Sequence, residues 1–165
     1  MREFRISVFG PGDSVEVLTE LLHRAYKGLG DRGMNYTAVD QAVQTTRERI
    51  KGRTCLLATV GGRLVGTLNL HLDGKHELRP GAAYISQFGV EPEMQGSGIG
   101  GNLLDHAEYM ARESGFAEVA MDTALDADEL MRYYTRRGYV QLGTHQWPGK
   151  TYRSAILVKQ LHAAP

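Results

Sequence analysis

This chain of 165 residues lacks the features that mark several classes of protein. It has a single cysteine, Cys55, so an internal disulfide is excluded and a reducing cytoplasm is the expected location. Lysine plus arginine and aspartate plus glutamate both number 19, and the formal net charge of zero predicts no broad attraction to nucleic acid or to an anionic membrane. No apolar run approaches membrane-spanning length, and the N-terminus lacks the long apolar core of a secretion signal.

Two kinds of catalytic chemistry also find little support. The six histidines are scattered without the paired spacing of metal ligands, so we assign no metal site. Cys55 falls within an apolar strand pattern, which favours a buried and inert thiol over a nucleophile. The content of 42% hydrophobic and 23% charged residues is ordinary for a globular protein. A chain of this length suits one well-filled core, and we expect a single domain over residues 1–165.

Strand-like and helix-like segments alternate along the chain. Apolar and alternating runs predict strands over residues 4–9, 54–60, 63–72, 81–90, 117–123, 139–144 and 152–161. Helical spacing of apolar residues predicts four helices, which begin near residues 13, 37, 99 and 126. The expected fold class is α/β (α+β), with a mixed, mostly antiparallel central sheet of about seven strands, four flanking helices and one helical crossover.

Some local details accompany this prediction. Asp13 with Glu16, and Asp126 with Glu129, are typical of capping boxes at the start of a helix. The run Lys-Gly-Leu-Gly-Asp-Arg-Gly at residues 27–33 is expected to form a flexible break between the first two helices.

The most informative segment follows the strand predicted at 81–90. The strand should end near Pro92, and a loop with glycine at positions 96, 98, 100 and 101 leads directly into an amphipathic helix. Glycine lets backbone N–H groups turn toward a ligand, and a helix N-terminus adds unpaired N–H groups and the positive end of the helix dipole. The combination predicts a seat for phosphate or pyrophosphate.

Two ligand motifs overlap in this loop. Residues 96–101 match the dinucleotide pattern G-x-G-x-x-G, and Asp122 lies near the expected acidic position. Residues 95–100 also match Q-x-x-G-x-G. The dinucleotide fingerprint needs its first glycine almost at the end of the strand, whereas residues 91–95 intervene here. Dinucleotide binding is therefore an alternative of lower rank, as is a glycine-rich turn without a ligand.

Two motifs resemble the GNAT superfamily, the acyl-CoA-dependent N-acyltransferases. The run Val-x-Pro-Glu-x-Gln-Gly-x-Gly-Ile-Gly at residues 90–100 looks like the acyl-CoA pyrophosphate loop of that superfamily. The run Arg-Tyr-Tyr-Thr-Arg-Arg-Gly-Tyr at residues 132–139 is similar to its aromatic-Tyr-x-x-x-Gly-aromatic segment. The motifs occur in the family's order, and the order of predicted elements agrees over nearly the whole chain.

The resemblance implies a GNAT fold in which strands four and five splay apart, with acetyl-CoA as co-substrate. Backbone groups of Phe88, Gly89 and Val90 would pair with the pantetheine arm, because a splayed edge leaves its N–H and C=O groups free. The pyrophosphate would be bound mainly by backbone amides of the following residues: Gln95, Gly96, Ser97, Gly98, Ile99, Gly100 and Gly101.

The catalytic acid implied by the resemblance is Tyr134, which matches a tyrosine that lies near the thioester sulfur in many GNAT enzymes. A phenol is protonated at neutral pH and can therefore donate a proton to the departing thiolate. Tyr133 is the rival, one position and about 100° around the helix. Because Tyr134 shares a helix face with Leu130, we expect Tyr134 to point inward.

The general base is not identified. The run 83–90 of the predicted strand carries no acid or histidine, although Tyr84 or Ser86 could hold a water molecule. Asp122 and His71 are outside candidates, and an amine that loses its proton before binding would need no base. Many relatives have an asparagine that contacts CoA where this chain has Ala127.

The sequence thus predicts a cytoplasmic N-acetyltransferase that transfers acetyl from acetyl-CoA to a primary amine of a small molecule or peptide. Amine attack would be direct, in a ternary complex. The alternative is a non-catalytic acyl-CoA-binding sensor or partner module. The resemblance implies that the acceptor would lie near Tyr26, residues 30–36 and residues 145–149, where neither an acidic run nor a basic patch specifies its charge. A homodimer is one possible assembly.

Overall fold

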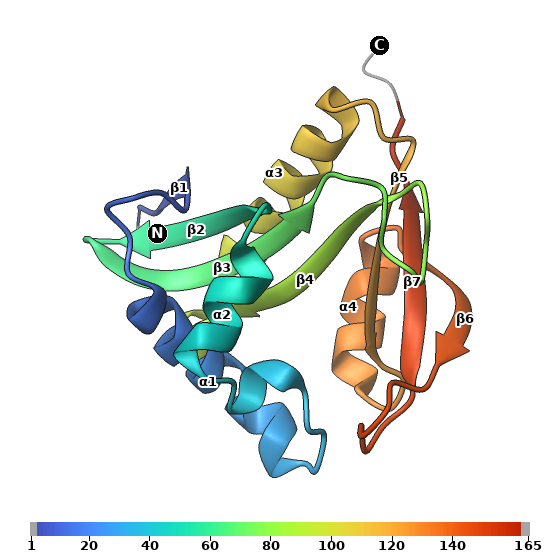
Figure 1. Ribbon diagram of the computed structural model, residues 1–165, viewed down its shortest axis with the longest axis horizontal. Coiled ribbons are helices and arrows are strands. Elements are labelled where there is room, and N and C mark those ends of the chain that lie inside the picture. The colour runs from blue at the N-terminus through green and yellow to red at the C-terminus, as the bar shows by residue number, and fades with distance from the viewer. Residues whose placement is uncertain (1–2, 163–165) are drawn as a thin grey trace.

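The computed structural model describes residues 3–162 and has a seven-stranded sheet with helices on both faces (Figure 1). The strands are β1 (Arg5–Val8), β2 (Thr54–Val60), β3 (Arg63–His71), β4 (Ala83–Val90), β5 (Glu118–Ala124), β6 (Val140–His145) and β7 (Ser154–Gln160). The α-helices are α1 (Val15–Asp31), α2 (Val43–Ile50), α3 (Ile99–Glu113) and α4 (Asp128–Arg136). Two short 3₁₀ turns are η1 (Thr37–Val39) and η2 (Pro92–Met94).

The order of strands in the sheet is β1-β2-β3-β4-β5-β7-β6. Every neighbouring pair is antiparallel except β4 and β5, which are parallel and are joined by the crossover through α3. Figure 1 shows α1 and α2 in front of β2–β4, and α3 behind them. The predicted fold class, a mostly antiparallel mixed sheet of seven strands with four helices and one crossover, is confirmed among the described residues.

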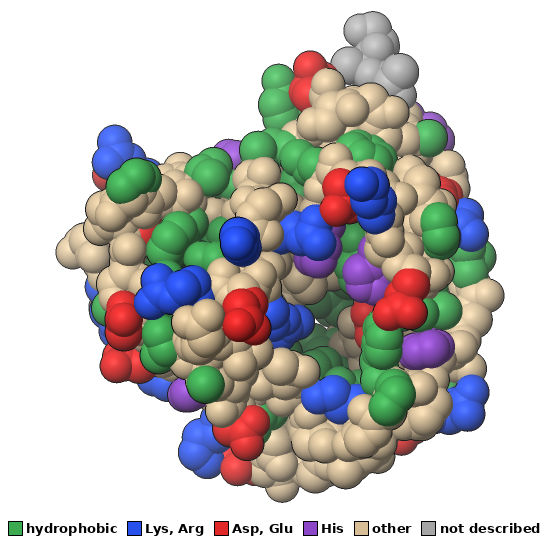
Figure 2. All heavy atoms as spheres, viewed as in Figure 1, with side chains coloured by type: hydrophobic (Ala, Val, Ile, Leu, Met, Phe, Trp, Pro, Cys, Tyr) green, Lys and Arg blue, Asp and Glu red, His purple; other side chains and the backbone are tan. Residues whose placement is uncertain are grey.

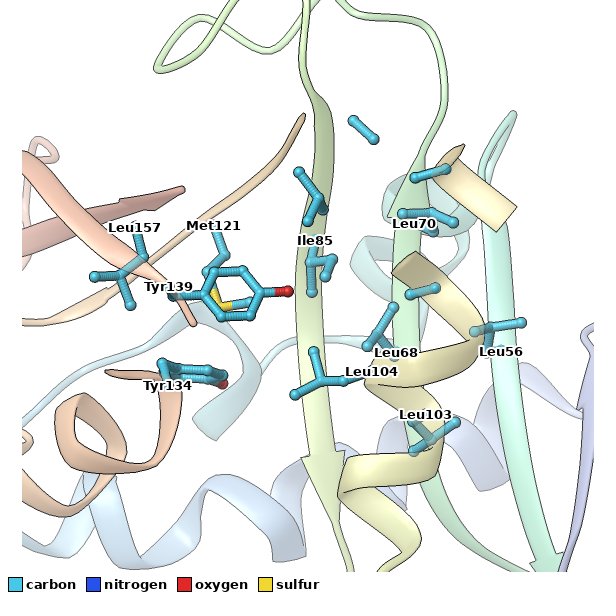
Figure 3. Close-up of a cluster of buried hydrophobic side chains, with 14 of the residues drawn as sticks. Leu56, Leu68, Leu70, Ile85, Leu103, Leu104, Met121, Tyr134, Tyr139 and Leu157 are labelled. Carbon is cyan, nitrogen blue, oxygen red and sulfur yellow. The ribbon is translucent and has the colours of Figure 1, made fainter. Parts of the chain in front are cut away.

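The core differs on the two faces of the sheet. Behind β2–β4, the apolar stripe of α3 packs on the strands, with Leu103 and Leu104 both fully buried. This cluster continues across β4 to α4 and β7, where Figure 3 shows Tyr134, Tyr139 and Leu157 on one side of Ile85 and Leu103 on the other. A smaller cluster joins α1 to the front face of β2. Because both groups of strands share one apolar cluster, the sheet holds together although β4 and β5 barely pair.

Strands β4 and β5 pair over a very short distance. Their register covers Ala83 with Val119 and Tyr84 with Ala120, after which the strands diverge. A register shift between β3 and β4 lies just beyond this point, at Gln87, whose φ of +48° is the only positive value for a non-glycine residue in the described part of the chain. Such a β-bulge bends its strand, which carries the second half of β4 away from β5.

Helix α1 holds the bent part of β4 in place. The Tyr26 hydroxyl donates to the Phe88 carbonyl at 2.8 Å. A Cβ on Gly89 would lie 2.9 Å from the Cβ of Ala25, a distance that real side chains do not adopt. Helix α1 can approach this closely because residue 89 has no side chain. This contact gives a packing reason for glycine at position 89, which the sequence pattern alone did not provide.

Three local predictions were wrong. Residues 27–31 continue α1 instead of forming a flexible break. The reason is that η1 packs closely on this part of the helix, where a Cβ on Gly30 would lie 2.8 Å from the Val39 side chain. Helix α1 is capped by Ser14, whose Oγ accepts from the Val17 amide, while the Asp13 carboxylate binds the Gly10 amide. The second predicted helix is split into η1 and α2.

The capping box predicted at Asp126 was also wrong. Helix α4 begins one residue later than that box requires, with Ala127 at the N-cap position and no capping side chain. Its first turn still carries Asp128 and Glu129, whose charges suit the positive end of the helix dipole.

The end of β4 is tied down by a buried carboxylate. Glu91 has a side chain that is 5% exposed and accepts hydrogen bonds from Arg24 Nε and Nη2 on α1, at 2.9 Å each to the nearest oxygen. Arg63 on β3 approaches within 3.5 Å of the same carboxylate. The Glu91 amide donates to the Val65 carbonyl at 2.7 Å. One side chain therefore fixes the point where β4 ends and the glycine-rich loop begins.

We predict that Glu91→Gln lowers the free energy of unfolding by about 1–3 kcal/mol, since it removes hydrogen bonds between a buried carboxylate and charged donors. The matched control is Glu93→Gln, which removes an exposed pair with Arg63 and should cost less than about 1 kcal/mol. Urea unfolding of the two variants measures both values. Equal losses would contradict the role given to Glu91.

Candidate active site

A cleft of about 580 Å³ opens where β4 and β5 diverge. Its walls come from the bent half of β4, from Met121, Asp122 and Thr123 on β5, from α1 and from α4. The glycine-rich loop closes one end. The cleft therefore joins the two parts of the sequence that the GNAT resemblance singled out, residues 90–100 and 132–139.

The glycine-rich segment forms a loop only as far as Gly98, because Gly100 and Gly101, predicted to lie in the loop, belong to the first turn of α3. Gly96 and Gly98 have φ of +79° and +89°, in the left-handed region that favours glycine. Gly98 is the N-cap of α3, so the first amides of that helix point out of its N-terminus toward the cleft side of the loop. The Ser97 hydroxyl bonds the Met94 carbonyl and closes the turn from within.

The space in front of the loop fits a ligand without side chains from the loop itself. A Cβ on Gly100 would lie 3.4 Å from the Phe88 ring and 3.6 Å from the Tyr133 hydroxyl, so it would project into the cleft. A Cβ on Gly101 would lie 3.2 Å from Arg137 Nη1. Glycine at position 100 leaves room beside Phe88 and Tyr133, and glycine at position 101 lets the Arg137 guanidinium approach the start of α3.

Two arginines at the end of α4 also line the cleft, and sequence reasoning did not name them. Arg136 and Arg137 both border it, and Arg137 Nη2 donates to the Gly101 carbonyl at 3.2 Å and also pairs with Asp105. Their charges favour an anion near the loop. Both arginines belong to the run 132–139 that the sequence singled out. Their position beside the glycines, however, depends on how α4 packs in the fold.

The two candidate tyrosines on α4 face different parts of the cleft. Tyr134 is 6% exposed and borders the cleft, and its hydroxyl makes no hydrogen bond to any residue within the described range 3–162. Burial raises its pKa well above the usual value, so the phenol stays protonated. The Tyr133 hydroxyl lies instead beside Gly100 and Gly101. The expected inward direction of Tyr134 agrees with its burial.

Nearly all predicted cofactor residues border this cleft, with two exceptions. The side chains or backbone that line it include Phe88, Gly89, Val90, Gln95, Gly96, Gly98, Gly100 and Gly101. Ser97 and Ile99 do not line it, since the Ser97 hydroxyl is turned back into the loop and the Ile99 side chain is buried in the core. Only the backbone amides of these two residues remain available for a ligand.

A second cavity of about 360 Å³ adjoins the first and shares with it Tyr26, Tyr36, Ser86 and Asp122, among others. Trp147 and neighbouring residues of the β6–β7 connection form its outer wall, in the region where the sequence predicted an acceptor. Figure 2 shows the surface hollowed between the α1–α2 side and the β6–β7 side, with basic and histidine side chains at the rim.

Asp122 borders both cavities and is held from two sides. The Tyr84 hydroxyl donates to one carboxylate oxygen, and Trp147 Nε1 donates to the other at 2.9 Å. The His76 ring stacks on Tyr84 with centroids 3.4 Å apart. Burial, followed by the charge of Asp122, raises the pKa of Tyr84, so Tyr84 acts as a donor to Asp122 and is not a base.

Ser86 links the cavities to a partly buried histidine, His71. The hydroxyl of Ser86 lies 2.8 Å from His71 Nε2 and accepts from Asn69 Nδ2 at 3.2 Å. Burial, with a smaller contribution from the charge of Arg53, lowers the pKa of His71 to about 4. The imidazole is therefore neutral at pH 7 but a weak base. Of the four base candidates, only Asp122 combines a carboxylate with a position at both cavities.

The sequence also predicted an unreactive Cys55, no metal site and no membrane-spanning segment. Cys55 is buried, and burial raises its pKa to about 11, which leaves a protonated, unreactive thiol at neutral pH. Among residues 3–162, no three histidine, cysteine or acidic side chains gather as metal ligands would. Within the same range no helix has the length and apolar character needed to cross a bilayer.

The sequence profile described as Acetyltransferase (GNAT) family matches residues 15–139, which cover both the glycine-rich loop and the α4 tyrosines. The match spans most of the chain. This protein therefore belongs to the GNAT family of acetyltransferases, and its fold is the GNAT fold.

Similar proteins include two curated acetyltransferases. An aminoalkylphosphonate N-acetyltransferase of Salmonella typhimurium is 33% identical over 85 residues, 52% of this chain and 55% of that protein. A mycothiol acetyltransferase of Actinosynnema mirum is 27% identical over 132 residues, 79% of this chain and 42% of that protein. This chain thus matches about half the length of these relatives.

A solved structure supports the fold. A GNAT family acetyltransferase from Elizabethkingia anophelis, with acetyl-CoA bound, is 15% identical and superposes with a TM-score of 0.71. The superposition covers 96% of this chain and 98% of the other. Similarity at this level of identity concerns the fold alone.

Proposed function

We propose that this protein is an acetyl-CoA-dependent N-acetyltransferase that acylates a primary amine of a small molecule or peptide by direct attack in a ternary complex. The observation that carries the proposal is that two cavities adjoin and share a wall. One borders the glycine-rich loop and Tyr134, the other borders Trp147, and both border Ser86 and Asp122. An enzyme of this kind needs two sites that meet where the bond forms.

The proposed acetyl-CoA site uses backbone more than side chains. The amides from Gln95 to Gly101 would bind the pyrophosphate, aided by the N-terminus of α3 and by Arg137. The free part of the β4 edge near Phe88 and Val90 would pair with the pantetheine amides. The Phe88 carbonyl already accepts from Tyr26, so the arm would use other backbone groups of this edge or share that carbonyl's second lone pair.

In the proposed reaction the amine nitrogen forms a bond to the thioester carbonyl carbon, and the carbon–sulfur bond breaks. Tyr134 would donate its phenolic proton to the departing thiolate. Its raised pKa keeps the phenol protonated at neutral pH, and its hydroxyl has no competing hydrogen bond within residues 3–162. The phenol is then restored by a proton from solvent.

Asp122 would receive the proton that the amine loses, directly or through water. Its position at both cavities supports this role, and the donors Tyr84 and Trp147 fix its orientation. Each carboxylate oxygen has a second lone pair for the amine. Asp122 was an outside candidate from the sequence, and this proposal prefers it to a water held by Tyr84 or Ser86.

The direct test of this function is thiol release from acetyl-CoA with a panel of primary amines, together with mass detection of acetylated product. We expect acceptor-dependent release of one thiol for each amide formed. Tight acetyl-CoA binding without turnover of any amine, including peptides, would instead favour a sensor. Binding of NAD in place of CoA would favour a dinucleotide site.

We predict that Tyr134→Phe lowers kcat about a hundredfold, the usual contribution of a positioned general acid, while the affinity for acetyl-CoA changes little. Stability should also change little, because the hydroxyl makes no hydrogen bond in the described range. The matched control is Tyr133→Phe, which removes the neighbouring hydroxyl beside the glycine loop. An unchanged kcat for Tyr134→Phe, with chemistry rate-limiting, would exclude Tyr134 as the acid.

A further inference from the structure

The outer half of the second cavity contains two cations. Arg49, at the end of α2, and Lys150, in the β6–β7 connection, both line it, far apart in sequence but facing the same space. The sequence showed no basic run here, because the two charges come from segments that only the fold brings together. Neither residue borders the first cavity, so this charge belongs to the acceptor side.

Arg49 carries a partly buried guanidinium. Nη1 donates to Gln41 Oε1 at 2.9 Å, a neutral partner. In the part of the chain that the structure describes, no carboxylate lies within the 4.0 Å of an ion pair with Arg49. Burial lowers the pKa of Arg49, as expected for a charge withdrawn from water. A partly buried cation of this kind is costly unless something negative compensates it.

Lys150 is held in place by neutral groups as well. Its Nζ donates to the Asn35 carbonyl at 2.7 Å and to Thr37 Oγ1 at 3.0 Å, which leaves its third proton free for another acceptor. Burial and then the charge of Arg49 lower the pKa of Lys150, so the two cations act on each other. The loop is fixed by further bonds between Asn35 and the backbone of Gly149 and Thr151.

The polarity of the cavity changes from one end to the other. Asp122 lies where the cavity meets the acetyl-CoA cleft, and Arg49 and Lys150 line the part that does not. The wall is also aromatic, with Tyr152 stacked at 4.7 Å on Tyr36, which borders both cavities. A volume of about 360 Å³ suits a small molecule better than a long peptide.

We propose that the acceptor is a small primary amine that carries an anionic group, a carboxylate or a phosphonate, and that Arg49 and Lys150 bind this group. Asp122 would orient the amine at the other end. Arginine binds carboxylate and phosphonate oxygens through its planar fork, and lysine adds a point charge. This inference rests on the proposed N-acetyltransferase function and specifies its substrate class.

The test compares matched acceptors that differ in the anionic group. β-Alanine and 2-aminoethylphosphonate are the carboxylate and phosphonate probes. Their matched partners, 3-aminopropanol and ethanolamine, carry a hydroxyl in place of the anionic group and are called the neutral amines below. We expect kcat/KM for at least one anionic probe to exceed that of its neutral partner by roughly ten- to a hundredfold, the value of charge-assisted hydrogen bonds. The stronger of the two probes identifies the anionic group.

The residues are tested by Arg49→Met and Lys150→Met, each of which should reduce the anionic-to-neutral ratio by roughly tenfold or more. The matched control is Arg47→Met, on the same helix but outside both cavities, which should keep the wild-type ratio. Unfolding curves show whether each variant is folded. If Arg49→Met or Lys150→Met does not fold, the other variant alone provides the test.

The outcomes separate the two proposals. If no amine is acetylated, the proposed function fails, and the anion site is then tested by thermal stabilisation with β-alanine or 2-aminoethylphosphonate against the neutral amines. Neutral amines acetylated as well as anionic ones would overturn the inference, as would selectivity that survives both substitutions. The inference would also be overturned if the best acceptor were a peptide with a free N-terminal amine, an amidated C-terminus and no acidic side chain, acetylated equally well by the Arg49→Met variant.

Discussion

The site depends on one constraint: β4 and β5 pair at only two positions before they separate. The bulge at Gln87 turns β4 away, and the buried Gln41 amide holds the Gln87 side chain at 2.8 Å in this conformation. Helix α1 then fixes the departing strand through the Tyr26 hydroxyl and the close contact at Gly89. The sheet can be split in this way because the apolar cluster behind it runs from α3 to β7 without interruption.

The separation of β4 from β5 creates the two cavities, one proposed to bind acetyl-CoA and the other the acceptor. The cleft that continues along β4 ends at the glycine-rich loop, where backbone amides and the arginines of α4 favour an anion. The cavity on the other side of Ser86 and Asp122 has an aromatic wall and two cations without counter-ions among the described residues. The proposed transfer would occur where these spaces meet, beside Tyr134.

The sequence predicted most of the fold and part of the site, for identifiable reasons. The seven strands and the turn at Gly96 and Gly98 depend on local patterns: all seven strands are found, with boundaries within two residues of the predicted ranges. The errors arose where distant contacts override local preference: Gly30 stays helical because η1 packs on it, and Ser14 caps α1 because Asp13 binds another amide. Pairings between distant segments, such as Glu91 with Arg24, have no local signal at all.

The central claim is that the opened edge of β4 and the amides of the glycine-rich loop form one continuous acetyl-CoA site. Amide hydrogen exchange with and without acetyl-CoA tests it most directly, because it reports on the backbone itself. The account predicts slower exchange in residues 88–90 and 95–102 when the ligand is bound. Unchanged exchange in both segments under saturating acetyl-CoA, with protection elsewhere, would contradict it.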